Sequence, residues 1–187
     1  QAHARAHFLL GAGRLRAGGP ALAEAEQHLA EAARLAGQHG LIRVAAGSRF
    51  ELGNLYAERG DLEAAVQAYL ESLATATAAG DTTQRVLSHN NTAFHLMLLG
   101  RLEEAREHID AALALSDAYD LRVPCQFLYS TRGEIALAAG ELDDAEGWFN
   151  RSLAEAGHFD NREHMAKGKA NLAQVAARRG DTDTALI

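Results

Sequence analysis

One spacing dominates this sequence: glycine recurs every 40 residues, at Gly60, Gly100, Gly140 and Gly180. The six residues that start at these glycines read GDLEAA, GRLEEA, GELDDA and GDTDTA. A period of this length is typical of chains in which one supersecondary unit stacks on copies of itself. The period therefore constrains the fold more strongly than any other feature of the sequence.

Four other columns of the repeat keep the size of their side chains. One column is small, at Gly13, Gly53, Ala93, Gly133 and Ala173, and another is always alanine, at Ala25, Ala65, Ala105, Ala145 and Ala185. A third is large and apolar, at Leu29, Tyr69, Ile109 and Phe149, and a fourth is small, at Ala32, Ser72, Ala112 and Ser152. Helices approach to about 8 Å only where side chains are small. We therefore expect Gly53 and Ala65 to form the contact within one hairpin, with Tyr69 filling the space against the next repeat.

Each period predicts two helices, for example Leu41–Arg59 and Asp61–Ala79. In the second, apolar residues recur at the 3.6-residue spacing of one helical face, at Leu62, Ala65, Val66, Tyr69, Leu70 and Leu73. Gly60 is a typical stop for the first helix, and Asp61 is a typical N-cap for the second. Two further pairs have the spacing of a capping box, Asp81 with Gln84 and Asp160 with Glu163.

These signals predict an all-α chain of about nine to ten helices in a single domain, 1–187. The repeats would cover about 1–40, 41–80, 81–120, 121–160 and a truncated 161–187. The chain starts inside a helical pattern without a methionine and stops early in a second helix. We therefore interpret it as a fragment of a longer chain.

The repeat resembles the tetratricopeptide repeat, whose signature is W-x2-L-G-x2-Y, then A-x3-F, then P. The matching positions here are Arg49, Leu52, Gly53, Tyr56, Ala65, Tyr69 and Thr77. The sequence departs from the family in having no tryptophan in the first column and a period of 40 instead of 34. The resemblance implies a right-handed α-α superhelix, and repeats this long are similar to those of large bacterial regulators.

Charge and composition exclude several classes of function. The net charge is −7, whereas a protein that binds nucleic acid directly needs a basic face. No apolar run is long enough to span a membrane. The single cysteine, Cys125, cannot form an internal disulfide, which favours a cytoplasmic location. We interpret Cys125 as a small apolar packing residue.

No motif predicts catalysis or a cofactor. The chain has no P-loop, no H-E-x-x-H and no C-x-x-C, and Arg16 stands where the third glycine of a dinucleotide fingerprint belongs. His3 and His7 are four residues apart, but two ligands at a fraying helix start are too few for a metal site. The other seven histidines do not cluster in the sequence. We therefore expect no enzyme, no cofactor and no metal.

Function should then come from the surface. By the family resemblance, the first helices of successive repeats line a concave groove that binds a protein or a peptide. The groove residues would be Arg14, Phe50, Asn54, Asn90, Asn91, Phe94, Phe127, Glu134 and Gln174. An amide side chain can form hydrogen bonds with both the N–H and the C=O of a bound peptide, and an exposed phenylalanine can provide an apolar contact for one of its side chains. Alternatively, the phenylalanines pack between repeats and the amides are only solvated.

One known mode of the family does not fit. Repeats that hold chaperone C-terminal tails clamp a carboxylate with two asparagines and several basic residues. Asn54 and Asn91 match the asparagines, but the basic positions read Phe50, Phe127 and Thr131. A groove without these cations would hold a dianionic terminus poorly.

The leading hypothesis is therefore a non-enzymatic interaction scaffold within a larger bacterial regulatory protein. The alternative is a sensor whose groove binds a small molecule or signal peptide and controls a neighbouring transcription-factor, ATPase or cyclase domain. We also expect self-association through the C-terminal end, because the helix around Leu172 and Val175 would lack its partner.

Overall fold

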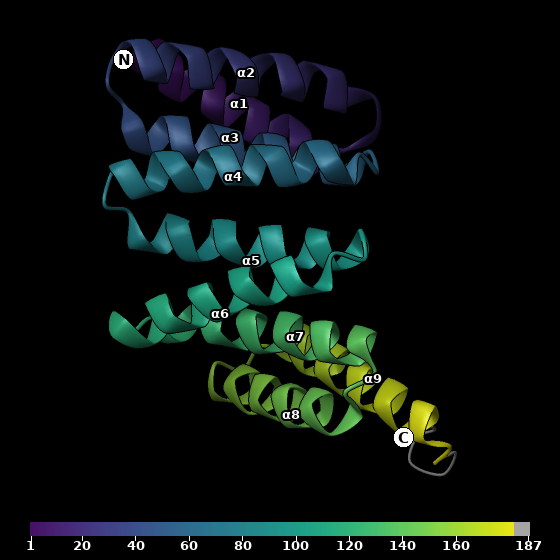
Figure 1. Ribbon diagram of the computed structural model, residues 1–187. Coiled ribbons are helices and arrows are strands. Elements are labelled where there is room, and N and C mark those ends of the chain that lie inside the picture. Colours follow the sequence, from purple (N-terminus) through teal and green to yellow (C-terminus); the bar gives the residue numbers. More distant parts are fainter. Residues whose placement is uncertain (182–187) are drawn as a thin grey trace.

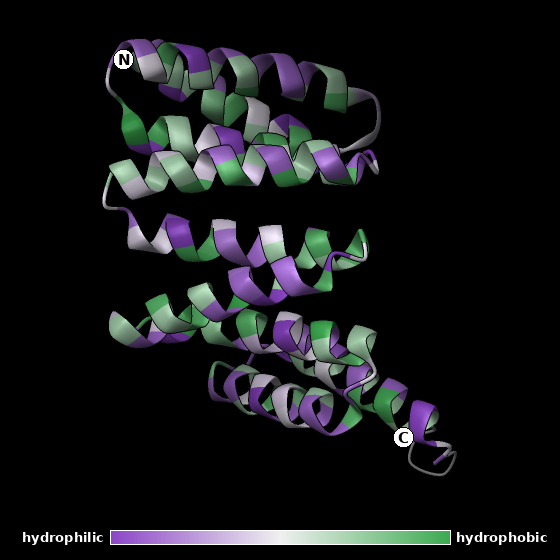
Figure 2. Ribbon diagram, viewed as in Figure 1, coloured by the Kyte–Doolittle hydropathy of each residue, from purple (hydrophilic) through white to green (hydrophobic). Residues whose placement is uncertain are grey.

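The computed structural model describes residues 1–181. In this part of the chain, nine α-helices stack as antiparallel hairpins in sequence order, with no strand (Figure 1). The helices are α1 (Ala2–Ala17), α2 (Leu22–Gln38), α3 (Ile42–Glu58), α4 (Leu62–Ala78), α5 (Thr82–Leu98), α6 (Leu102–Ala118), α7 (Arg122–Ala139), α8 (Leu142–His158) and α9 (Arg162–Arg179). A 3-10 turn, η1 (Gly19–Ala21), lies between α1 and α2. The predicted all-α superhelix is confirmed. Hydrophobic and hydrophilic residues are mixed along the helices, as expected where each helix buries only part of its surface (Figure 2).

The repeat glycines end helices as the period predicts. The φ angles of Gly60, Gly100, Gly140 and Gly180 lie between 77° and 82°, in the left-handed region that glycine adopts without steric cost. The residue after each glycine then donates its N–H back into the helix, as Asp61 does to the Tyr56 carbonyl at 2.9 Å. The turns between repeats use the same conformation at Gly40, Gly80, Asp120 and Asp160.

The capping predictions are only partly right. The Asp61 carboxylate accepts from the Ala64 N–H, and the Asp81 carboxylate accepts from the Gln84 N–H, both at 3.1 Å. The proposed capping box at Asp160 and Glu163 is wrong. Asp160 is the turn residue, with φ 50°, and the cap is Asn161, which accepts from the His164 N–H at 3.2 Å.

Within a hairpin, a large side chain of the second helix covers a small residue of the first. A Cβ added to Gly53 would lie 2.5 Å from the Tyr69 ring, and one added to Gly133 would lie 2.6 Å from the Phe149 ring. The closest side chain to Gly53 is thus Tyr69 of the same hairpin, and Ala65 is fully buried. Tyr69 also reaches the next repeat, where its ring centroid lies 5.2 Å from that of His95.

The first hairpin departs from the period by two residues. Leu29 covers Gly11, at 2.6 Å from a Cβ built there, while Gly13 has open space around it. The assignment of Gly13 to the contact column is therefore wrong. The cause lies in the turn: α1 already ends at Ala17, and Gly18 to Ala21 form a longer connection that contains η1. The residues of α1 are therefore shifted by two relative to the 40-residue period, so that Gly11 takes the place that Gly13 would have and corresponds to Gly53.

Histidines that are distant in the sequence pair across two hairpins. The Nδ1 atoms of His7 and His28 are 2.9 Å apart, and those of His89 and His108 are 3.0 Å apart. Burial, together with the neighbouring His108 and Arg85, lowers the pKa of His89 to about 4. The second pair is therefore uncharged at neutral pH.

The contacts between repeats alternate with a longer period of 80 residues. After the second and fourth repeats the contact is polar and centres on a serine that also donates within its own hairpin, Ser72 to the Ala46 carbonyl and Ser152 to the Gln126 carbonyl. Gln84 and His164 occupy the same position of the repeat and contact Ser72 and Ser152, respectively. After the first and third repeats these columns hold Ala32 with Val44 and Ala112 with Pro124. The hairpin thus repeats every 40 residues, and the type of contact between neighbouring hairpins repeats every 80 residues.

The second helix of the fifth repeat, including Ala185, lies outside the described residues. The apolar residues that we expected at an open C-terminal end are covered in part. Val175 is buried against Phe149, and Leu172 is half-buried beside the same cluster. Self-association through this end stays a prediction.

The glycine contact gives a matched pair of variants. We expect Gly53→Ala to destabilise the protein, because the overpacking cost of about 1–3 kcal/mol exceeds the gain in helix propensity. Gly13→Ala should instead stabilise it by up to about 1 kcal/mol, because its methyl group meets nothing. Urea denaturation followed by circular dichroism compares the two free energies of unfolding. Equal effects would contradict the assigned contacts.

Acid should weaken the third repeat. The His89 pKa is lowered in the folded state, so its contribution to stability is complete above about pH 6.5 and is lost as the pH falls toward 4. The free energy of unfolding, measured by urea denaturation between about pH 7 and pH 4, should fall less steeply in His89→Gln than in the parent. Parallel curves would show that His89 does not titrate in this way.

Candidate partner-binding groove

Three adjoining hollows form one groove along the first helices α5, α7 and α9. Their volumes are about 560, 280 and 530 Å³. Phe127 lines both the first and the second hollow, while Phe94 and Lys167 line both the second and the third. We call this continuous surface the α5–α7–α9 groove.

The first hollow is apolar. It lies between α5, the start of α7 and the turn that precedes α9, and its apolar lining includes Leu87, Val123, Phe127 and Phe159. These four side chains are between 37% and 63% exposed. Such a cluster is informative because large apolar side chains scattered singly over a surface need no explanation, whereas a contiguous patch indicates binding.

The middle of the groove adjoins a chain of hydrogen-bonded amides. The buried Tyr69 hydroxyl donates to Asn54 Oδ1 at 2.8 Å, and Asn91 Nδ2 donates to the same oxygen at 3.3 Å. Asn90 Nδ2 donates to Asn91 Oδ1 at 3.3 Å, while Asn90 Oδ1 is buried without a partner among the described residues. Burial raises the pKa of Tyr69 to about 12, so its hydroxyl stays a neutral donor.

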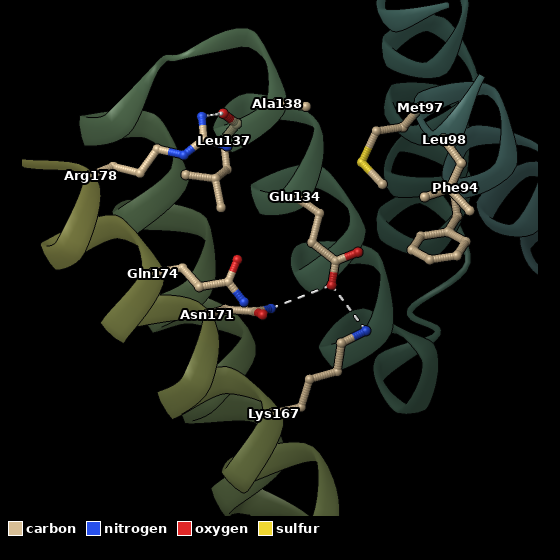
Figure 3. A pocket seen from close by; sticks show the side chains of 10 residues that line it. All are labelled: Phe94, Met97, Leu98, Glu134, Leu137, Ala138, Lys167, Asn171, Gln174 and Arg178. Atoms are coloured by element: carbon tan, nitrogen blue, oxygen red, sulfur yellow. Dashed lines mark hydrogen bonds and ion pairs between the residues drawn. The ribbon is translucent and has the colours of Figure 1, made fainter. Parts of the chain in front are cut away.

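The third hollow combines apolar side chains with charged and amide side chains, and one ion pair lies within it (Figure 3). Glu134 Oε1 accepts from Lys167 Nζ at 2.9 Å and from Asn171 Nδ2 at 3.3 Å, so that the carboxylate points toward α9. The Arg178 guanidinium turns toward α7, where it donates to the Leu137 carbonyl at 3.4 Å. The ammonium of Lys167 also lies 5.9 Å from the centroid of the Phe94 ring.

The structure gathers most of the predicted groove residues. Six line the three hollows: Asn90, Asn91, Phe94, Phe127, Glu134 and Gln174. Asn54 joins them through Asn91, and Phe50 lies half-buried with its ring centroid 5.4 Å from that of Tyr69. Arg14 is separate, in an ion pair with Glu24 of α2 at 3.1 Å, because the shift of α1 moves it out of its expected column.

Sequence reasoning missed several lining residues. Asn171 occupies the same position of the repeat as Asn91, so the period could have identified it. Val123 and Phe159 lie at the ends of turns, where the periodic pattern carries no information about exposure. Arg178 lies one turn beyond Gln174 and joins the groove only through its long side chain.

The described residues offer little for catalysis. Burial raises the pKa of the Cys125 thiol, and its Sγ donates to the Leu121 carbonyl at 3.2 Å, so the reactive thiolate is disfavoured. No group of three or more His, Cys, Asp or Glu side chains within residues 1–181 is placed to hold a metal ion. Over the same residues, no helix is long and apolar enough to cross a membrane.

Comparisons with known proteins agree with this architecture. A family model described as "Tetratricopeptide repeat" matches residues 46–71, 86–111 and 168–186. A solved structure of BtubC (BKLC) from P. vanneervenii is 18% identical, with a TM-score of 0.66, and the match covers 98% of this chain and 85% of that one. A putative kinesin light chain from Podosopora anserina with nearly identical TPR-like repeats is 16% identical, with a TM-score of 0.71, over 97% and 89% of the two chains. A variant of the same protein has a TM-score of 0.72. No curated protein sequence matches significantly.

The buried tyrosine predicts a measurable change. Tyr69→Phe removes one donor from Asn54 Oδ1 and should cost about 1 kcal/mol. Because the Tyr69 pKa is raised in the folded state, the parent should also lose stability as the pH rises from about 10 toward 12. Urea denaturation of both proteins at neutral and alkaline pH tests the prediction. The variant should show a smaller alkaline loss, and an identical loss would contradict the role given to Tyr69.

Proposed function

We propose that this chain, which is built of tetratricopeptide repeats, is a non-enzymatic scaffold that binds a protein or peptide in its α5–α7–α9 groove. Arrays of such repeats generally mediate protein–protein interactions. The continuity of the three hollows supports the proposal best, because shared lining residues join the apolar first hollow to a third hollow that has charged and amide side chains among apolar ones. We infer from the resemblance to tetratricopeptide repeats that this surface is the concave face of the superhelix.

The groove suits an extended segment. The twelve residues from Lys167 to Arg178 rise about 16 Å along α9, which is the span of about five residues of extended chain. One apolar side chain of the segment would occupy the hollow beside Phe127. Backbone groups would then meet the side chains of Asn90 and Asn91, which line the middle hollow.

The balance of charge sets the class of partner. Glu134 is neutralised by Lys167, and the middle of the groove carries amides and hydroxyls. Binding would therefore depend mainly on apolar contact and hydrogen bonds, with a salt-dependent contribution from Arg178, whose guanidinium donates to the Leu137 carbonyl. Nucleic acid does not fit such a surface. We infer a cytoplasmic bacterial regulatory protein as the parent chain, with no cofactor.

A second function is favoured by one observation. The apolar hollow of about 560 Å³ is within the usual size range of small-molecule sites, about 300–1,000 Å³. A sensor would bind an apolar molecule or the end of a signal peptide there. It would pass the change to a neighbouring transcription-factor, ATPase or cyclase domain.

Substitutions in the groove test the scaffold. A partner is first isolated with the full-length parent, and affinities are then measured by isothermal titration calorimetry. Phe127→Ala and Phe94→Ala should each weaken binding by more than about fivefold, the effect of losing an apolar anchor worth over about 1 kcal/mol. Glu107→Ala, on the exposed side of α6, is the control and should bind like the parent.

Stability is measured alongside affinity, because Phe94 also contacts His95. A folded Phe127→Ala protein that binds normally, with binding lost in Glu107→Ala, would refute the groove. Binding of a small apolar molecule that is lost in Phe127→Ala, without a protein partner, would favour the sensor.

A further inference from the structure

A further hollow lies where the second helices α6 and α8 meet the start of α7. Its volume is about 190 Å³, and most of its lining side chains are polar or charged, among them Ser116, Asp117, Asp120, Arg122, Tyr129 and Glu155. We call it the α6–α8 hollow. It lies across the α6–α7 turn from the first hollow of the groove, because Asp120 and Arg122 line both.

Two residues of this hollow depart from the pattern of the repeat. Ser116 stands in a column that otherwise holds fully buried alanines, namely Ala36, Ala76 and Ala156. Glu155 stands in a column whose other members are uncharged, namely Leu35, Thr75 and Leu115. The polar character of the hollow thus comes from residues that the same columns of the other repeats do not have.

Both residues bury an oxygen atom that has no hydrogen-bond partner among the described residues. Ser116 is only 3% exposed, and its hydroxyl is unpaired. Glu155 Oε1 accepts from Arg122 Nη2 at 2.6 Å, whereas Glu155 Oε2 is buried without a partner. Burying such an oxygen costs free energy, and the other repeats avoid this cost with alanine, leucine or threonine in the same columns. Packing alone therefore does not explain Ser116 and Glu155.

The α6–α8 hollow favours positive charge. Three carboxylates, of Asp117, Asp120 and Glu155, line it together with one guanidinium, of Arg122, which leaves a formal charge of −2. The last turns of α6 and α8 also border it, and their partial negative charge outweighs the partial positive charge at the start of α7. Burial raises the pKa of the Cys125 thiol beside the hollow, and the charges of Glu155 and Asp117 raise it further, against the opposing effect of Arg122.

Size and geometry select a small organic cation. The volume of about 190 Å³ is below the roughly 300–1,000 Å³ that is usual for the sites of drug-sized ligands. Within residues 1–181, no group of three or more His, Cys, Asp or Glu side chains is placed to hold a metal ion. An ammonium group is less demanding, because it donates its hydrogen bonds in separate directions to oxygen atoms that stay apart from one another.

We propose that the α6–α8 hollow binds a small primary amine, and that a short linear diamine fits it best. The two ammonium groups of such a diamine match the formal charge of the hollow. One ammonium would lie beside Glu155 and Ser116, and the other would lie beside Asp117 and Asp120. The methylene groups between them would contact Leu113, which also lines the hollow.

Binding requires two side chains to move. The Arg122 side chain is 60% exposed, so it would swing outward from Glu155 as the ammonium enters. Ser116 would turn about its Cα–Cβ bond, so that its shielded hydroxyl accepts from the same ammonium. Arg122 thus competes with the ligand for the Glu155 carboxylate, and this competition gives the proposal an effect of opposite sign that can be measured.

Calorimetric titration with 1,4-diaminobutane tests the site. The titration is done at neutral pH and low ionic strength, because salt screens the exposed carboxylates. We expect saturable binding of one diamine per chain. Butylamine, which has one ammonium, should bind more weakly, and 1,4-butanediol, which has the same length and no charge, should not bind.

Substitutions assign the binding to the α6–α8 hollow. Glu155→Gln and Ser116→Ala should each weaken it by about tenfold or more, the effect of losing a hydrogen bond to a charged group. Arg122→Gln should strengthen it, because the competing guanidinium is gone. Glu103→Gln, at the opposite end of α6, removes the same charge as Glu155→Gln and is the matched control that should bind like the parent. Phe127→Ala should also bind the diamine normally, which separates this site from the groove.

Circular dichroism confirms that each variant is folded, and the melting temperature supplies a second measurement. The diamine should raise the melting temperature of the parent and of Glu103→Gln, and leave that of Glu155→Gln unchanged. No saturable binding by the parent, or equal binding by Glu155→Gln and Glu103→Gln, would overturn the proposal. Tighter binding of a lysine with both backbone ends capped would also overturn the diamine, because it would indicate the lysine side chain of a partner protein.

Discussion

The architecture depends on one contact that recurs in the hairpins: a large side chain of the second helix lies on a small residue of the first. Leu29 on Gly11, Tyr69 on Gly53 and Phe149 on Gly133 leave no room for a methyl group on the glycine. The contact fixes how closely the two helices approach and at which residue they cross. Once each hairpin has this fixed shape, stacking the hairpins places the first helices beside one another. The groove along α5, α7 and α9 is a consequence of that stacking.

The same contact explains which parts of the structure could be predicted. The glycines that recur from Gly60 onward located the turns, and the apolar stripe of 62–73 identified its helix to within one residue at each end. The shift of α1 could not be predicted, because Gly18, Gly19 and Pro20 allow more than one turn length and only packing selects Gly11 over Gly13. That shift removed Arg14 from the groove and brought His7 opposite His28. Both outcomes depend on the contact of Gly11 with Leu29, which lies in the next helix.

The positions of groove residues could be predicted where the residues follow the helical period, and not elsewhere. Asn91, Phe94 and Glu134 lie on the faces that the repeat columns indicated. The amides, however, bond chiefly to each other and to Tyr69, which no column could show. Val123 and Phe159, which make the first hollow apolar, flank turns. The exposure of a residue beside a turn depends on the next repeat and not on the local pattern.

The central claim is that the α5–α7–α9 groove contacts the partner, and site-specific photocrosslinking tests it most directly. The photoreactive residue p-benzoylphenylalanine would replace Phe127 in one full-length protein and Glu107 in another, each expressed in its native host. Mass spectrometry would then map the crosslinked segment. We predict a discrete adduct from position 127, competed by the unlabelled parent, and none from position 107. A discrete adduct from position 107 alone would contradict the account.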